Sequence, residues 1–241
     1  MITVFQRASL ALLLLFAVLS SSIKSSAMQN QVPYLLTETV AAKDVEVLAT
    51  LNLLERLSPR LKFSVVATAY LDALSILEEK GTCSEFFGGS EAATLVLNEL
   101  ITKLEESSIK EQDVAIRMFG EVTIVQNLRL NLSYRMFEKA FINTMGPFYR
   151  LGNGLRTVGR FRSSTREARA LMLLHELAHL MRNASGDWLI PNDGKGSPAG
   201  LTLRNSKIIE AACRTPLAAL KRKPHLNLRK LAVTGQSEAG G

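Results

Sequence analysis

The stretch RSSTREARALMLLHELAHLMRN, residues 162–183, constrains the fold more than any other part of the chain. Its apolar residues recur with helical spacing, which predicts a long helix that packs into the core. Ser164 and Glu167 have the spacing of a capping box, so we expect the helix to begin near Thr165. Asn183 offers a stop at the other end. A domain with this sequence is therefore built around this helix.

The same helix carries a pattern of side chains that can bind a metal. His175 and His179 are two of only three histidines in the chain, and a spacing of four puts them on one helical face. Both imidazoles can then aim at one zinc ion, while Glu176, turned by about 100°, can accept a proton from a zinc-bound water. The alternative is two ordinary histidines on a packed helix, but the apolar flanks make these groups costly to bury without partners. The pattern predicts zinc with a general base beside it.

A zinc site of this kind needs a third protein ligand from beyond the helix. The remaining acids and the last histidine are Asp187, Asp193, Glu210, His225 and Glu238. Asp193 lies in PNDG, where a turn can return the chain toward the helix, and we predict it as the third ligand. Glu210, on a short helix expected to be capped by Asn205, is the alternative. Either could instead be an ordinary turn residue or surface charge.

The pattern resembles the zincin superfamily of metallopeptidases, over about residues 165–183. The pieces CSEFFGG, NTMGPFYR, LIPNDG and NSKIIEAAC are similar to a group of small secreted bacterial proteins of zincin type. The resemblance implies one zincin-like α+β domain over 28–220, mostly helical, with a small β-sheet and an HExxH active-site helix. The chain departs from metzincins, because Arg182 and Ser185 occupy the positions of their glycine and third ligand. Thermolysin-like enzymes have a glutamate where this chain has residues 198–200, PAG.

The first residues have the features of a secretory signal. Arg7 precedes an apolar run over 10–19, and Ser25 and Ala27 satisfy the small-residue rule for cleavage. The run is too short to span a bilayer comfortably, which argues against a retained membrane anchor. We therefore expect residues 1–27 to be a signal peptide cleaved near Ala27, and the protein to be exported to the periplasm or beyond the cell.

Cys83 and Cys213 are the only cysteines in the chain. In an oxidising compartment such a pair tends to bond, so we predict a disulfide; two buried free thiols are the alternative. The disulfide would close a long loop and stabilise the fold by about 4–5 kcal/mol in the chain-entropy model.

The formal net charge of +7 raises the question of nucleic-acid binding. Much of this charge lies in residues 221–241, which we predict to be a basic, disordered tail. No basic patch with interleaved aromatic residues supports base stacking. The sequence therefore argues against a nucleic-acid partner.

The remaining segments have weaker secondary-structure signals. The expected elements are a helix over 37–57, a segment over 62–81 with a strand-like start and a helical second half, a loop over 81–90, a helix over 91–106 capped by Ser90, strands within 112–134, and a further strand in 134–154 before a turn at 152–154. The short extended segments are expected to form the small sheet.

These observations predict a secreted zinc metallopeptidase, most simply a metalloendopeptidase, which hydrolyses peptide bonds in a peptide or protein substrate. The alternative keeps the zinc and omits catalysis, as in a secreted, zinc-stabilised binding protein. A third hypothesis treats the motif as accidental in a disulfide-linked helical protein. No stable membrane attachment is expected after signal cleavage. The substrate, the cleavage preference and the oligomeric state are not specified by the sequence.

Overall fold

The computed structural model describes residues 65–150 and 157–223 of the chain. The predictions for the signal segment 1–27, the helix over 37–57, the turn at 152–154 and the tail beyond 223 lie outside these residues. The first three tail residues are described, and among them Lys223 places its Nζ 3.0 Å from Ser75 Oγ.

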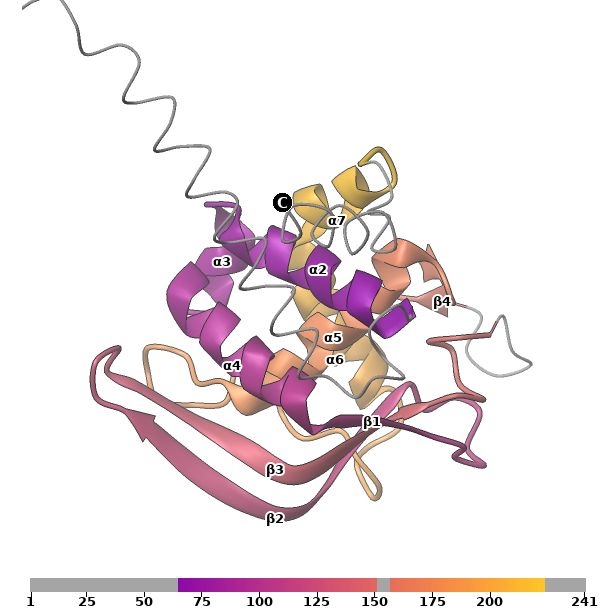
Figure 1. The fold of residues 1–241 in the computed structure, drawn as a ribbon, viewed down its shortest axis with the longest axis horizontal. Helices are drawn as coiled ribbons and strands as arrows, with labels where there is room; N and C mark the ends of the chain where they lie inside the picture. The colour runs from indigo at the N-terminus through magenta and orange to yellow at the C-terminus, as the bar shows by residue number, and fades with distance from the viewer. Residues whose placement is uncertain (1–64, 151–156, 224–241) are drawn as a thin grey trace, which may run out of the picture. The chain divides into compact units, whose positions relative to one another are not determined.

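Helices and short strands follow one another in a mixed order. The elements are α2 (Val65–Glu78), α3 (Thr82–Phe86), α4 (Ser90–Lys103), β1 (Leu104–Ser107), β2 (Ile116–Asn127), β3 (Leu132–Asn143), β4 (Thr157–Val158), β5 (Phe161–Arg162), α5 (Arg166–Leu180), α6 (Leu201–Ala212) and α7 (Arg214–Leu220). In Figure 1 the helices lie on one side of a small curved sheet. The protein is therefore α+β with a small sheet, as the sequence predicts.

The main sheet has three strands in the order β1-β3-β2. β2 and β3 form a long antiparallel hairpin, and β1 pairs with β3 in parallel. Tyr134 of β3 forms a further antiparallel bridge with Met181, and Arg182 forms one with Trp188. The chain that leaves α5 therefore runs along the free part of β3, which fixes the end of the helix against the sheet.

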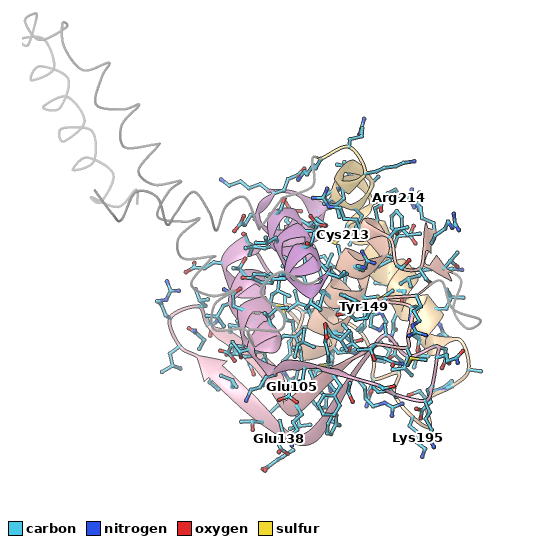
Figure 2. The ribbon with its side chains drawn as sticks, turned by 45° about the vertical axis from the view of Figure 1, so that its right-hand side comes forward. Glu105, Glu138, Tyr149, Lys195, Cys213 and Arg214 are labelled. Atoms are coloured by element: carbon cyan, nitrogen blue, oxygen red, sulfur yellow. A yellow bond between two sulfur atoms is a disulfide. The ribbon has the colours of Figure 1, made fainter. Side chains whose placement is uncertain are left out.

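Helix α5 lies at the centre of the core. Its buried residues cover almost the whole circumference, from Ala168 to Leu180. It contacts α2, α4, α6, α7 and the strands β3, β4 and β5. A helix that is buried on almost every side must be enclosed by neighbouring elements, which accounts for its many apolar residues. Exposed charges such as Glu138 and Lys195 lie at the outer edge of the protein instead (Figure 2).

The helix begins where the sequence indicates, although its cap differs by one residue. Thr165 is the N-cap, and its hydroxyl accepts a hydrogen bond from the backbone N–H of Ala168 at 3.3 Å. Ser164 has a positive φ of 62° and makes no capping box with Glu167, so that part of the prediction is wrong. The helix ends at Leu180, and Asn183 accepts bonds from Ser185 N and Asp187 N within the following turn.

Four other expectations for local structure need correction. The strand-like start of 62–81 is helical from Val65, because burial of Val66, Ala69, Tyr70 and Ala73 along one side outweighs the β propensity of its valines. The predicted loop over 81–90 contains α3. Ser90 is the first residue of α4 and not its cap, since Gly89 occupies that position without a side-chain bond. The helix expected to reach 106 ends at Lys103, because the next residues pair with β3 as β1.

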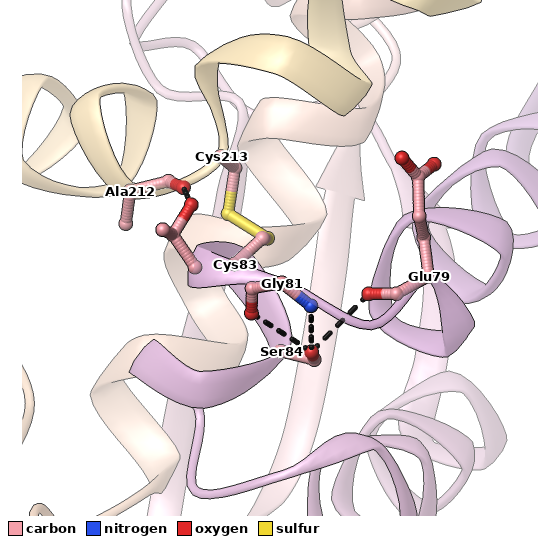
Figure 3. The surroundings of a disulfide bond; sticks show 7 residues. Glu79, Gly81, Cys83, Ser84, Ala212 and Cys213 are labelled. Carbon is pink, nitrogen blue, oxygen red and sulfur yellow. Dashed lines mark hydrogen bonds between the residues drawn. A yellow bond between two sulfur atoms is a disulfide. The ribbon is translucent and has the colours of Figure 1, made fainter.

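Cys83 and Cys213 form a disulfide, which confirms the predicted pairing. It joins α3 to the residue between α6 and α7, at a sequence separation of 130 (Figure 3). Beside it, the hydroxyl of Thr82 donates to the carbonyl of Ala212 at 2.8 Å. Disulfides form and persist in oxidising compartments, so this bond agrees with an exported protein. Within residues 65–150 and 157–223, no helix is both long enough and apolar enough to cross a membrane.

A buried ion pair joins the start of α5 to α2. Arg166 donates two hydrogen bonds of 2.6 Å to the carboxylate of Asp72, whose side chain is 2% exposed. The same guanidinium donates to the carbonyls of Leu220 and Lys223. The contacts hold α2, α5 and the end of α7 together.

Asp72→Ala is expected to lower the free energy of unfolding by about 3 kcal/mol, because it leaves the charge of Arg166 buried without its carboxylate. The expected loss of stability is at the lower end for buried ion pairs, because the Arg166 guanidinium keeps its hydrogen bonds to two backbone carbonyls. Urea unfolding followed by circular dichroism measures it. Glu79→Ala, which removes an exposed carboxylate directly after the end of α2, is the control and should change stability by less than about 1 kcal/mol. Equal stabilities of the two variants would contradict a structural role for the buried pair.

Candidate metal centre

Three side chains that can ligate a metal converge at one point beside α5. Nε2 of His175 lies 3.1 Å from Oδ2 of Asp193, and Nε2 of His179 lies 3.0 Å from Oδ1 of the same carboxylate. The two Nε2 atoms are 3.1 Å apart. Within the described part of the chain, this is the group of histidine, cysteine and acidic side chains whose geometry suits a metal ion. The structure thus brings together the three residues that the sequence suggests as ligands.

The loop after α5 carries Asp193 back to the helix, and Asn205 holds it there. Nδ2 of Asn205 donates to Oδ2 of Asp193 and to the carbonyl of Pro191, both at 2.9 Å. Within the loop, Asn192 Oδ1 accepts from Gly194 N at 3.1 Å and supports the turn. Asn205 is a buried residue inside α6, whose N-cap is Gly200, so its expected role as a helix cap is wrong.

The two histidines differ in their outer contacts. Nδ1 of His175 lies 3.0 Å from Oγ of Ser206, the residue after Asn205 on α6. Nδ1 of His179 is buried and has no hydrogen-bond partner among the described residues. The carbonyl of His179, however, accepts a hydrogen bond of 2.6 Å from Nε of Arg135 on β3. Apart from their shared contact with Asp193, His175 is therefore held through Nδ1 of its ring and His179 through its backbone carbonyl.

Arg135 belongs to a stacked group at the end of α5. Its guanidinium carbon lies 4.3 Å from the ring centroid of Trp188, and that of Arg182 lies 4.0 Å from the same centroid. Such cation–π contacts stabilise a folded loop against the sheet. The sequence does not indicate a role for Arg135, because nothing in the local pattern of a strand shows which distant carbonyl its guanidinium reaches.

Glu176 is the partly exposed residue of an otherwise buried run from Leu171 to Met181. In sequence it directly follows His175 and precedes His179 by three positions, so it lies on the same helix turn as the histidine pair. Burial raises the pKa of the Glu176 carboxyl, while the neighbouring histidines act in the opposite direction. A carboxylate with a raised pKa is a stronger base than an ordinary glutamate.

The charges at the site depend strongly on one another. Burial alone would raise the pKa of Asp193, but its hydrogen bonds with His175 and His179 hold that pKa well below the ordinary range. Burial alone would lower the pKa of His175, but the hydrogen bond to Asp193 and the charges of Glu176 and Asp193 raise it. Asp193 therefore stays ionised and places a negative charge beside both rings.

Glu210, the alternative third ligand, has other partners. One of its carboxylate oxygens accepts a bond of 3.1 Å from the backbone N–H of Arg160, and the other contacts Nε of Arg160. Gly159 lies against this carboxylate with φ of 57°, and a Cβ there would lie 2.2 Å from Oε2. Glu210 therefore binds the tight turn between β4 and β5, and the structure does not bring it to the histidine pair.

The donor atoms fit a divalent cation. Two imidazole nitrogens 3.1 Å apart cannot both direct lone pairs at each other without a proton or a cation between them. Two histidine nitrogens and one carboxylate oxygen are donors that zinc accepts, and three protein ligands are typical of its catalytic sites. The ionised Asp193 offsets part of the charge of such an ion.

No family model, curated protein or solved structure matches this chain. The function is therefore inferred from the geometry of the site and from the sequence pattern.

Proposed function

We propose that the protein is an exported zinc-dependent peptidase of zincin type. In this proposal His175, His179 and Asp193 hold the zinc ion, and Glu176 is the general base. The observation that carries it is the convergence of both Nε2 atoms and the Asp193 carboxylate within 3.1 Å of one another, beside a partly exposed glutamate. A site with these four groups has both the ligands and the base that peptide hydrolysis needs.

The chemistry divides between the metal and the chain. Zinc, when bound, supplies a Lewis acid that activates water and polarises a carbonyl oxygen. Glu176 accepts the proton from the attacking water and transfers it to the leaving nitrogen of the peptide bond. Asp193 and the two histidines would keep the zinc ion next to Glu176.

The alternative is an exported, zinc-stabilised binding protein without catalysis. It keeps the zinc and omits the base chemistry, and a partner could then bind away from the metal, for example at an open surface depression of about 620 Å³ along α4 that contains none of the proposed site residues. Its lining consists of Glu78, Ser90, Glu91, Thr94, Leu95, Asn98, Glu99 and Arg129. In this reading the metal stabilises the fold and a partner binds elsewhere.

The exported location is supported by the disulfide and by the composition of residues 1–27. In this proposal the segment is a signal peptide removed near Ala27. Mass spectrometry of the mature protein from the secreted fraction tests it, and an intact N-terminus in that fraction would contradict it.

Purified protein is expected to contain about one zinc per chain, and His179→Ala is expected to lose it. Loss of a ligand should weaken zinc binding by more than about 100-fold, since even residues that only orient ligands contribute 10–100-fold. Elemental analysis after dialysis against trace zinc measures the content. His225→Ala, which removes the third histidine of the sequence, is the matched control and should retain zinc.

Circular dichroism must first show that wild type and both variants are folded. A folded, zinc-supplied wild type without bound metal would reject both zinc-based proposals and leave the motif as an accident of helix composition.

A further inference from the structure

Helix α6 buries polar side chains where a packed helix would ordinarily bury apolar ones. The buried residues of this helix are Asn205, Ser206, Ile209 and Glu210. Asparagine, serine and glutamate are rarely buried without partners, because the loss of hydration must be offset by hydrogen bonds. The partners of these side chains therefore indicate what the buried face of α6 does.

Asn205 directs its amide group at the loop that carries Asp193. Both neighbours of its Nδ2 are acceptors, the carbonyl of Pro191 and Oδ2 of Asp193, so the nitrogen must face them. Oδ1 of Asn205 is then buried without a hydrogen-bond partner among the described residues. An asparagine that served only to pack α6 would gain nothing from this arrangement. The unpaired oxygen is the cost of holding the Asp193 carboxylate in one orientation.

Ser206 meets the other ligand residue. Its hydroxyl lies 3.0 Å from Nδ1 of His175, on the far side of the ring from Asp193. When Nδ1–H donates to this hydroxyl oxygen, the Nε2 of His175 keeps its lone pair for a metal. A hydroxyl group suits this position because it accepts as well as donates.

We propose that Asn205 and Ser206 are positioning residues that set the affinity and geometry of the metal centre, an inference that rests on the proposed zinc site. Asn205 fixes the carboxylate of Asp193, and Ser206 fixes the ring of His175. Because they are consecutive on one helix, a single element aligns a loop ligand with a ligand of α5. Neither residue touches the metal or the substrate.

The end of α6 is itself anchored, which makes it suitable for this role. Cys213 follows the helix directly and is bonded to Cys83 on α3, and the carbonyl of Ala212 accepts from Thr82. Figure 3 shows these two links side by side. A residue one turn beyond Ser206, Glu210, has a buried polar side chain on the same face but contacts the turn at Arg160. It therefore provides an internal control for damage to α6 that does not involve the ligands.

The test compares zinc affinity in four full-length variants, Asn205→Leu, Ser206→Ala, Ser206→Thr and Glu210→Gln. Competition with a chelator of known affinity measures the Kd for zinc alone, without any substrate. Asn205→Leu and Ser206→Ala are expected to raise the Kd by about 10–100-fold, as other outer contacts of metal ligands do. Ser206→Thr keeps the hydroxyl and should restore most of the affinity. Glu210→Gln should stay within about threefold of wild type.

A second measurement separates positioning from loss of structure. Cobalt(II) in place of zinc gives an absorption spectrum that depends on the arrangement of its ligands, and Asn205→Leu should shift it, whereas Glu210→Gln should not. Leucine keeps the branched shape of asparagine but is larger, so thermal unfolding of the metal-free variants must show that each remains folded.

Unchanged zinc affinity and cobalt spectra in Asn205→Leu and Ser206→Ala would overturn the positioning role while leaving the zinc site intact. Equal weakening in Glu210→Gln would overturn it too, because the effect would then come from α6 as a whole. A wild type that binds no zinc would reject the proposed function itself, which is a different result.

Discussion

Glu176→Gln is expected to abolish peptide hydrolysis while the protein keeps its zinc. The amide has nearly the same shape as the carboxylate but cannot accept the proton of the attacking water at neutral pH. General-base catalysis contributes 10²–10⁴-fold, so kcat/KM should fall by about 10³-fold. Glu176 is not one of the three side chains that converge as metal ligands, so the zinc content should remain near one per chain. Cleavage of unfolded casein and of a peptide library, together with elemental analysis, measures both quantities.

Glu167→Gln is the matched control, because it makes the same change on the same helix in its first turn. It should keep both activity and zinc. Equal inactivity of wild type and Glu176→Gln on broad substrates, with one zinc bound to each, would contradict the peptidase proposal. That outcome would favour the zinc-stabilised binding protein.

Removing the disulfide is expected to produce the largest loss of stability. The bond closes a loop at a sequence separation of 130, for which the chain-entropy model gives about 4–5 kcal/mol. This is comparable with the whole stability of a marginal domain. The double variant Cys83→Ala with Cys213→Ala should therefore unfold at much lower urea concentration than wild type. Circular dichroism along a urea titration measures the midpoint and the free energy of unfolding.

Alanine is preferable to serine here because both cysteines are buried, and a buried hydroxyl without a partner would add its own cost. Wild type reduced with a phosphine should unfold at a similar urea concentration to the double variant. A double variant as stable as oxidised wild type would show that other contacts, such as the bond from Thr82 to Ala212, suffice to hold α3 against α6.

Several local features follow from the sequence for simple reasons. The helix near 165–180 and its start near Thr165 are predictable because apolar periodicity is a local property, whereas the predicted capping box of Ser164 with Glu167 does not form. The placement of His175 and His179 on one face follows from helical geometry alone. The disulfide is predictable because the chain has only two cysteines.

Other local expectations are wrong where tertiary contacts outweigh local preference. Leu104–Ser107 leaves the helical pattern because it pairs with β3, a strand that follows nearly thirty residues later. Val65 and Val66 favour strands in isolation, yet they start α2, whose inner side is buried against α4 and α5. In each case the deciding partner is distant in the chain.

For the candidate metal site, too, some features follow from the local sequence and others from tertiary contacts. The sequence by itself determined the helix, the two histidines on one face and the glutamate beside them, because spacing within a helix fixes these relations. Only the tertiary structure decided that Asp193 reaches the histidines while Glu210 binds Arg160. Only the tertiary structure brings Asn205 into contact with Asp193 and Ser206 into contact with His175. It also places Arg135 against the carbonyl of His179 at the end of α5. These contacts depend on the path of a loop and on the packing of α6, β3 and α5, and no local rule of the chain specifies such a path.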